Sequence, residues 1–520
     1  MCHGTRLNTS VSLGSTTQYL SSWLQHLPPL GLYIAVAVII GLSLQKKFAT
    51  VTGEAIPNGP VGLPVLGSLP FLAKYPERTL HYWKKIYGGL YSIRLGNQLV
   101  IVVSDPEIAK DLMVTNGAIF SSRKNMFIKS HTIFHGRAIT ATQYNNERKH
   151  RRIAMTRLTQ RAVDSYSSSL DNEAMALIKS LLDASSRGRI PVDPQLHSGR
   201  CSLNNMTNIV FGFRTDSIDH PLVKRAWALS LEFMNCTGPM SNFVDFIPIL
   251  QKMPSSLQKR GRRLHTDLVE TYGGLIKDVE MKMRLGEEVP DCLAKTMILH
   301  REEEGLDGLD MAFIATAFMI GGVFTTAAVL QWFIALMATN PDIQKKAHAE
   351  LDQVIGQTRP PSIEDEEKLP YCHALIKEVE RLRNPFWLGT PHASSEDFVY
   401  RSWFIPKDTV VVLNTWSMQH DPRRRKDPEI FNASCPAYSE SANAPDPWTR
   451  DHWVFGAGRR ICPGVLVAER EIWLTISRML WAFEMAEVSA EPIDLTEYEG
   501  ISGRAPVQFR VNLRPRHGNV

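Results

Sequence analysis

Cysteine is scarce in this chain: its seven residues are scattered, and no CxxC pair is present. An odd number without the spacing of a metal site or a disulfide framework excludes a zinc ribbon and a disulfide scaffold. We therefore expect a reduced, cytosolic body, in which any cysteine that does chemistry acts as a free thiolate.

An excess of charge of one sign is also missing. The formal net charge is +5 over 520 residues, which is too small to indicate a nucleic-acid-binding protein. It is compatible with one basic face that meets an acidic partner or an anionic membrane. No solenoid-type repeat is present, and 44% of the residues are hydrophobic, which is enough for a large packed core.

Long uncharged apolar runs are rare, and the clear one extends from Leu27 to Leu44. Such a run spans roughly 27 Å as a helix, enough to cross a hydrocarbon core. Lys46 and Lys47 follow it, which places the body on the cytosolic side. The alternative, a secretory signal peptide, would have a more basic start and a shorter run. We predict a lumenal segment (1–26), an anchor (27–45) in the endoplasmic reticulum membrane and a glycosylation site at Asn8.

A proline-rich hinge is predicted over residues 46–64. Three prolines and two glycines between Ile56 and Pro64 exclude a helix there. We expect this segment to fix how the body sits over the membrane, whereas an ordinary linker would set no orientation.

The remainder, residues 65–520, reads as one mostly α-helical domain with a small sheet. The segment from Asp421 to Trp453 has little periodicity and is expected to be a long ordered loop. Apolar spacing predicts helices at 105–116, 144–185, 222–235, 255–285, 311–338 and 341–355, and short strands at Leu90–Leu95, Leu99–Val103, Thr409–Leu413 and Val507–Leu513.

The segment Phe455 to Gly464 has the composition that a buried haem thiolate requires. Cys462 lies in a loop whose glycines, Gly458 and Gly464, permit unusual dihedrals and close approach to a porphyrin. Arg460 can reach a haem propionate, and an apolar helix follows. A thiolate ligand favours O–O cleavage. The alternatives are a structural cysteine and a GxGxxG phosphate loop; the latter lacks its third glycine and its preceding strand.

This segment resembles the FxxGxRxCxG signature of the cytochrome P450 family. The resemblance implies the family's mostly helical fold, haem b with Cys462 as its iron ligand, and electrons from NADPH through a cytochrome P450 reductase. Phe455, Gly458 and Gly464 would shape the loop, and Arg460 would bind a propionate.

Further motifs occur in the expected order. Glu378 and Arg381 match the ExxR pair, in which buried opposite charges on one helix face need each other. His392 resembles a propionate contact. Gly322 and Thr325 match the oxygen-activation motif, where glycines open the core helix and the threonine hydroxyl contacts oxygen; close packing within a buried helix is the alternative.

An early basic stretch matches a helix near a propionate and the reductase. Arg148 and Arg151 are both candidates for that contact, and a solvated basic face is the alternative.

Three positions depart from the family pattern. Phe324 replaces the usual acid beside Thr325, so proton delivery would run through Thr325, water or substrate hydroxyls. Glu147 replaces a tryptophan in the early basic helix. The loop at Phe431–Pro436 lacks the arginine that joins the ExxR pair, for which Arg423, Arg424, Arg425 or Arg450 could substitute.

The motifs favour a monooxygenase that oxidises a small apolar or aromatic molecule, by analogy in the biosynthesis of fungal secondary metabolites such as aromatic polyketides. Phenol coupling or dehydrogenation on the same haem, and an inactive haem-binding relative, remain alternatives. Aromatic residues suit a flat ligand, although ordinary core packing would use them equally well. The predicted substrate pocket consists of Phe318, Phe324, Phe386, Trp387 and Leu388.

Overall fold

The computed structural model describes residues 55–72, 74–137, 139–140, 148–433, 444, 446–450 and 452–520. The predicted lumenal segment, the anchor, the first part of the hinge, Glu147, residues 434–436 of the Phe431–Pro436 loop and the side chain of Arg148 lie outside the described part.

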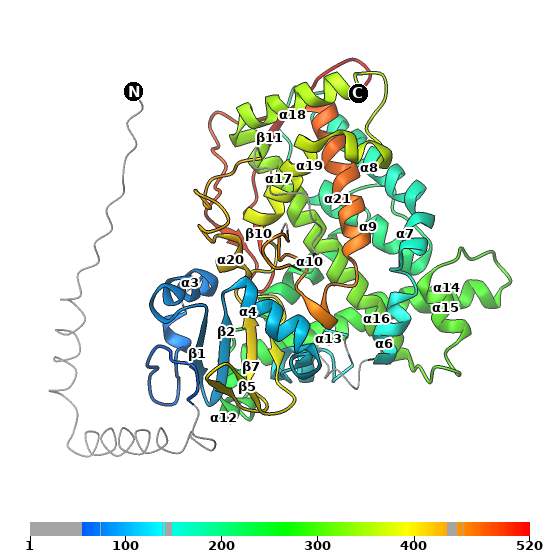
Figure 1. Cartoon of the computed structure of the whole chain (residues 1–520). Coiled ribbons are helices and arrows are strands. Elements are labelled where there is room, and N and C mark those ends of the chain that lie inside the picture. The colour runs from blue at the N-terminus through cyan, green and yellow to red at the C-terminus, as the bar shows by residue number, and fades with distance from the viewer. Residues whose placement is uncertain are drawn as a thin grey trace, which may run out of the picture.

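Helices dominate the molecule and surround one long central helix (Figure 1). Its first section, α16, begins with a capping box between Asp307 and Asp310, which satisfies the first free backbone N–H groups. It continues through a single π-helical turn, η6, into α17. Most of its side chains are buried, because it is apolar on all sides and packs against neighbours all round. The bounds are α16 (Gly308–Met319), η6 (Ile320–Phe324) and α17 (Thr325–Thr339).

The other helices pack around this axis or form the lower edge of the molecule. Before the central helix lie η2 (Leu69–Phe71), α3 (Pro76–Tyr87), α4 (Pro106–Lys110), η3 (Asp111–Thr115), α5 (Gly117–Phe120), η4 (Phe127–Ile133), α6 (Arg148–Met155), α7 (Gln160–Ser165), α8 (Ser167–Ala184), α9 (Gln195–Phe211), α10 (Pro221–Cys236), α11 (Phe243–Phe246), α12 (Pro248–Gln251), α13 (Ser256–Leu268), η5 (Val269–Gly273), α14 (Gly274–Arg284) and α15 (Leu293–Leu299). After it lie α18 (Pro341–Val354), η7 (Ile363–Lys368), α19 (Pro370–Leu382), α20 (Thr415–Gln419), η8 (Gly458–Arg460) and α21 (Val465–Ala482).

A small sheet lies to one side of the helices (Figure 1). Its strand order is β1-β2-β7-β4-β3, and only the β2–β7 pair is parallel. Residues Val100–Val103 of β2 are buried in succession and pack into two different apolar clusters, so this strand is covered on both faces. The strands of this sheet are β1 (Leu90–Leu95), β2 (Gln98–Val103), β3 (Ser122–Arg123), β4 (His392–Ala393) and β7 (Val410–Leu413). The other strands form three two-stranded sheets: β5 (Phe398–Tyr400) with β6 (Trp403–Ile405), β8 (Phe483–Glu487) with β11 (Val511–Pro515), and β9 (Tyr498–Glu499) with β10 (Ala505–Pro506).

The described end of the predicted hinge is not helical and packs against β1. The backbone N–H of Ser92 donates to Asn58 O at 3.1 Å. A Cβ on Gly59 would lie 1.7 Å from Ser92 O, so only glycine allows this close approach.

Two of the longer helices, α3 and α9, were not predicted, and one predicted helix is divided. The region 144–185 contains α6, α7 and α8 rather than one helix. Helix α9 carries serine, asparagine and arginine, yet nearly its whole surface is buried. Its sequence therefore lacks the polar-outside period on which prediction depends. The amphipathic α3 was also missed.

Of the described residues, only the central helix is long and apolar enough to cross a membrane. Within the span Gly308–Thr339, 78% of the most apolar window is buried inside the protein, as expected for a core helix.

The ExxR pair is a buried, bidentate ion pair on α19. Arg381 donates to the two oxygens of Glu378 at 2.7 and 2.8 Å, and to Gln419 O at 2.9 Å and Pro428 O at 2.7 Å. Arg381 thereby binds the loop that follows α20, and the pair satisfies charges that burial would otherwise destabilise.

Arg425 takes the place of the arginine that the Phe431–Pro436 loop lacks. Its Nη1 lies 3.6 Å from Glu378 Oε2, and its side chain is largely buried. The other candidates make different contacts: Arg423 pairs with Asp421 and Asp105, Arg424 donates to Arg450 O, and Arg450 donates to Gly456 O.

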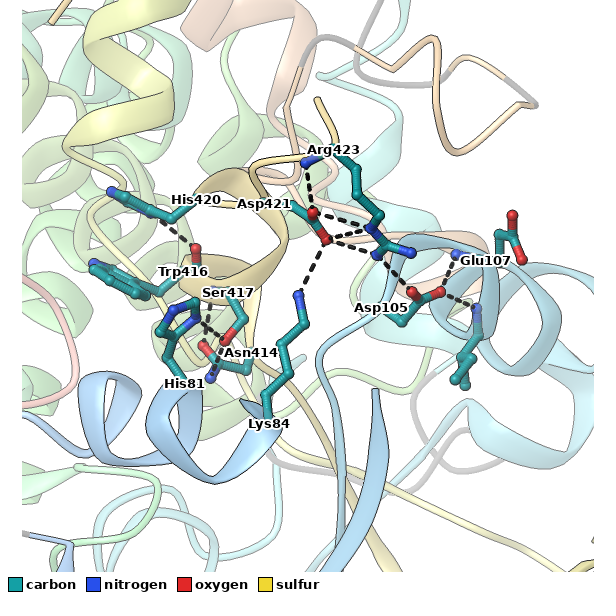
Figure 2. A network of polar contacts seen from close by, with 11 residues as sticks. His81, Lys84, Asp105, Glu107, Asn414, Trp416, Ser417, His420, Asp421 and Arg423 are labelled. Atoms are coloured by element: carbon teal, nitrogen blue, oxygen red, sulfur yellow. Dashed lines mark hydrogen bonds and ion pairs between the residues drawn. The ribbon is translucent and has the colours of Figure 1, made fainter. Parts of the chain in front are cut away.

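The loop that follows α20 is also anchored at its start, at Asp421, by a polar network (Figure 2). Lys84 of α3 donates to Asp421 at 3.1 Å, and Arg423 bridges Asp421 and Asp105, the N-cap of α4. Burial alone would raise the pKa of Asp421, but hydrogen bonds from Arg423 and Lys84 hold it below its ordinary value. The loop is therefore fixed between α3, α4 and α19.

Arg425→Met should lower the free energy of unfolding by about 2 kcal/mol, because Glu378 loses one of its charged neighbours. Chemical denaturation of the purified protein would measure this. Lys426→Met, which removes an exposed neighbouring charge, is the control and should change stability little. Equal losses in both variants would show that Arg425 does not support the ion pair.

Candidate active site

A largely apolar cavity of about 360 Å³ lies between the Cys462 loop and the central helix. Four separate segments of the chain contribute to its wall. These are the segments 121–140 and 317–325, the stretch 386–389 and the turn at Ser502. The side chain of Cys462 is accessible because it opens onto this cavity.

The backbone of the Cys462 loop has a conformation at Gly458 that requires glycine. Gly458 has φ +66°, and a Cβ there would lie 1.9 Å from Met113 O of η3. The loop therefore docks backbone to backbone against η3. The N–H of Cys462 donates to Phe455 O at 2.9 Å, which closes the loop and turns the sulfur inward.

The surroundings of the sulfur act on its charge in opposite directions. Burial raises the pKa of the Cys462 thiol, while the backbone N–H of Gly464 and the charge of Arg151 lower it. The net shift is upward, so the protein alone favours the neutral thiol. A metal cation at the sulfur would reverse this balance and hold a thiolate.

Cationic side chains line one part of the cavity. Arg460 donates to Ser121 O at 2.8 Å, and Arg151 of α6 donates to Ile461 O at 2.9 Å. Arg123 and His392 are cross-strand neighbours in the β3–β4 pair. Burial, together with the charges of Arg123 and Arg460, lowers the pKa of His392 well below its ordinary value, so His392 acts as a neutral hydrogen-bonding group.

This arrangement fits haem. One cysteine thiol faces a mostly apolar space, and Cβ atoms built on Gly321, Gly389 and Gly456 would meet no atom within 4 Å, which leaves room for a flat group. Arg123, Arg460 and His392 could hold its two carboxylates. Arg123 was not among the predicted residues, because only strand pairing reveals that it lies beside His392.

The π-helical turn η6 is part of the cavity wall that the central helix contributes. Gly321, Gly322 and Thr325 line the cavity, and Thr325 Oγ1 donates to Gly321 O at 2.6 Å. A π-turn widens the helix locally and redirects the side chains around it. Gly322 is needed for packing as well, because a Cβ there would lie 2.2 Å from Met206 Sδ.

Comparison with known proteins agrees with this geometry. The family model described as cytochrome P450 matches residues 57–512. The chain belongs to the cytochrome P450 family. It is 31% identical to the cytochrome P450 monooxygenase polD of Polytolypa hystricis, with 92% of this chain and 94% of that protein covered. It is 32% identical to patH of Aspergillus clavatus (89% and 91%) and 33% identical to acuC of Aspergillus aculeatus (85% and 85%), which are also named cytochrome P450 monooxygenases.

Membership identifies the enzyme class and the cofactor. The chain is a cytochrome P450 monooxygenase, and the family uses a haem thiolate supplied with electrons from NADPH by a reductase.

Within this P450, two of the aromatic residues predicted for the pocket do not line the cavity. Phe318, Phe386 and Leu388 do line it. Phe324 points away and stacks on Trp227 of α10, with ring centroids 5.5 Å apart. Trp387 faces a neighbouring, smaller pocket and packs edge-on against Trp416 and His420. Helical periodicity explains the first difference, because Gly321 and Thr325 share one face of the helix and Phe324 lies off it.

Two buried acids at the cavity were not predicted. Asp245 of α11 accepts from Ile128 N at 2.9 Å, and Glu471 of α21 accepts from Ser202 Oγ at 2.7 Å. Burial raises the pKa of Asp245 to about 6 and that of Glu471 to about 7. The charge of Glu173 adds to the shift at Glu471, whose Oε2 accepts no hydrogen bond from the described residues.

Glu471 should make the stability of this P450 depend on pH. Its pKa in the folded state lies above the value of about 4.5 for an unfolded glutamate. The protonated side chain therefore contributes fully to the free energy of unfolding below pH 4.5, and this contribution is lost as pH rises through about 7. Glu471→Gln removes that loss. Relative to wild type, the variant should gain about 2 kcal/mol between pH 5.5 and pH 8.

Thermal unfolding of the haem-loaded proteins at pH 5.5 and pH 8 measures this gain. Glu484→Gln, at an exposed glutamate, is the control and should behave as wild type at both values. A Glu471→Gln variant whose unfolding temperature relative to wild type is the same at pH 5.5 and pH 8 would contradict the assignment.

Proposed function

We propose that this P450 inserts one oxygen atom from O2 into a small apolar or aromatic molecule, within fungal secondary metabolism. The observation that carries this is one cavity in which the Cys462 sulfur and the Thr325 hydroxyl line the same apolar space. The fungal origin of the similar proteins supports the metabolic setting.

Each part of the wall has a distinct task. Cys462 would hold the haem iron, and Arg123, Arg460 and His392 its carboxylates. When bound, haem supplies the activation of O2 and accepts electrons from the reductase. The apolar wall, which includes Phe318 and Phe386, excludes water and orients a flat substrate.

Proton delivery rests on hydroxyl groups. Phe324 stands where the family carries an acid, and its ring is buried against Trp227 rather than in the cavity. Thr325 and Thr326 line the cavity, and a hydroxyl can accept one proton while it donates another. Thr325 Oγ1 donates to Gly321 O, which leaves its lone pairs to accept a hydrogen bond from a water or from a protic substrate group.

The missing acid also favours a second reaction on the same haem, the coupling or dehydrogenation of phenols. A phenolic substrate carries its own transferable proton and needs less help from the protein. The two reactions differ in whether oxygen from O2 remains in the product.

Turnover with a co-expressed NADPH-dependent reductase under isotopically labelled O2 tests these alternatives. Wild type should convert a component of the source organism's metabolite extract to a product with one labelled oxygen atom. Cys462→Ala should abolish conversion, because the metal loses its protein ligand. A dimeric or dehydrogenated product without label would establish coupling instead. Bound haem without any Cys462-dependent change would support an inactive relative.

We also infer attachment to the endoplasmic reticulum membrane, with the catalytic domain facing the cytosol. The apolar run at 27–44 would provide the anchor. Exposed apolar side chains support it: Val65 is 59% exposed and Ile249 68%. Their segments adjoin, because Gly96 N donates to Leu66 O at 3.1 Å and a Cβ on Gly96 would lie 2.3 Å from Phe246 O. Such a patch, close to the end of the hinge, fits a lipid surface.

The full chain should stay with microsomal membranes after a carbonate wash, and a chain that lacks residues 1–45 should be released. The truncated chain should still bind lipid vesicles through the exposed patch, and Val65→Glu with Ile249→Glu should weaken that binding several-fold. Leu299→Glu, at a residue that is 63% exposed on α15, is the control. Equal binding by all three truncated chains would exclude the patch from membrane contact.

A further inference from the structure

Glu471 brings a carboxyl group to the wall of the active-site cavity. It lies in the second turn of α21, lines the cavity and is 2% exposed. Its Oε1 accepts from Ser202 Oγ at 2.7 Å, whereas Oε2 accepts no hydrogen bond within the described part of the chain. A buried carboxyl oxygen without a partner is costly, so its position needs a chemical reason.

A second polar side chain beside Glu471 is also unsatisfied. The amide of Asn205 on α9 is close enough to lower the pKa of Glu471, yet neither of its polar atoms has the geometry of a hydrogen bond to any described residue. Buried polar atoms of this kind are normally satisfied by ordered water. Water is therefore the expected partner of the Glu471 carboxyl.

Helix α9 connects Glu471 to the central helix. Ser202, which holds the carboxyl, and Met206 lie one turn apart, about 6 Å, on the same face of α9. Met206 packs so closely on η6 that a Cβ on Gly322 would lie 2.2 Å from its sulfur. Thr326 follows Gly322 about one turn further along the central helix and lines the same cavity. A short chain of water molecules can therefore join the Glu471 carboxyl to the Thr326 hydroxyl.

The surroundings of Glu471 let it release and regain a proton near neutral pH. Burial and the charge of Glu173 on α8 raise its pKa to about 7, against the hydrogen bond from Ser202. Glu173 pairs with Arg214, whose side chain is half-exposed, so this end lies close to solvent. On α9, burial raises the pKa of the Cys201 thiol well above its ordinary value, so this thiol stays neutral.

Other neighbours of α21 add no charge that would compete for this proton. Helix α17 carries no ionisable side chain. The charged side chains on the remaining neighbours of α21 form ion pairs of their own: Asp164 with Arg470, Asp171 with Arg478, Lys377 with Glu469, Asp352 with Arg516, and Asp365 with Arg359.

We propose that Glu471 supplies protons to the oxygen that is reduced in the cavity, through water and the Thr326 hydroxyl, in place of the acid that is missing at Phe324. This inference rests on the proposed function. Insertion of one oxygen atom consumes O2, two electrons from NADPH and two protons, and the second oxygen atom leaves as water. The Glu471 O–H bond breaks, each hydroxyl along the chain passes on a proton, and a new O–H bond forms on the reduced oxygen. Solvent on the side of Glu173 then returns a proton to the carboxylate.

Oxidation of NADPH without an organic substrate tests this step, because it does not depend on which molecule the P450 oxidises. The haem-loaded full chain receives its co-expressed reductase, NADPH and O2. Oxygen that takes up two protons leaves as hydrogen peroxide and uses one NADPH, whereas oxygen that takes up four becomes water and uses two. Wild type should form a larger share of water at pH 5.5 than at pH 8, because Glu471 is protonated below about pH 7 and ionised above it.

Glu471→Gln should lower the share of O2 that becomes water about tenfold and remove its dependence on pH. Thr326→Val should lower this share similarly, and the double variant should be no worse than either single variant, because both changes interrupt one route. Glu471→Asp, which keeps a carboxyl, should retain part of the share. Glu484→Gln, at an exposed glutamate, is the control and should match wild type. Unchanged shares in Glu471→Gln or Thr326→Val, or additive losses in the double variant, would overturn the proposal.

Infrared spectroscopy of the resting, haem-loaded protein gives a readout that needs no turnover. The C=O stretch of a protonated carboxyl should be present at pH 5.5, weaken toward pH 8, shift in heavy water and be absent from Glu471→Gln. If Glu471→Gln removes no such band, or if heavy water leaves the band unshifted, Glu471 is not a proton donor in contact with water.

The proposed function fails separately. If reduced, carbon-monoxide-treated protein lacks the absorption of a thiolate-ligated haem, the monooxygenase is excluded. The infrared titration of wild type and Glu471→Gln still decides whether Glu471 exchanges protons with water.

Discussion

Buried charge on α19 holds the two loops on which the active site depends. On one side of this helix, Glu378 and Arg381 form a bidentate pair that binds the backbone after α20. Beside it, Glu380 meets His452, only a few residues before the Cys462 loop, with Nε2 to Oε2 at 2.9 Å. Burial would raise the pKa of Glu380, but His452 and Lys377 hold it below its ordinary value. Each pair is stable only because both partners are present, so α19 joins both loops to the helical body.

Direct contact between the backbones of the Cys462 loop and η3 then fixes the position of the sulfur. Gly458 packs against the carbonyl of Met113, and no side chain mediates between them. Because η3 follows the strand pair β1–β2 and α4, the sheet and the Cys462 loop form one rigid frame. The π-turn at Gly321 and Thr325 faces this frame from the central helix, whose buried surface allows little displacement.

The local parts of the site could be predicted from the sequence, and the parts made by tertiary contacts could not. Cys462, Arg460 and Gly458 belong to one short segment whose residue types are dictated by the chemistry. Arg123 becomes part of the site only through the pairing of β3 with β4, which joins residues far apart in the chain. Arg425 could be named only as one of several candidates, because four arginines follow Asp421 and their directions depend on the fold of a loop without periodicity. The helix α9 was missed for a related reason, since polar residues such as Ser202 and Asn204 form their hydrogen bonds inside the protein.

Phe324 shows how a departure from the family motif is accommodated. Its ring is fully buried and stacks on Trp227, while a Cβ on Gly503 would lie 3.0 Å from it. The interior is therefore fitted to an aromatic ring at this position, and a carboxylate there would be buried against indole and glycine without a charged partner among these neighbours. The protein consequently keeps its hydroxyl groups at the cavity but places no acid at this position of the relay. A substrate that brings its own hydroxyl group would supply an exchangeable proton at the cavity. We therefore expect the replacement at 324 to favour protic substrates over neutral hydrocarbons.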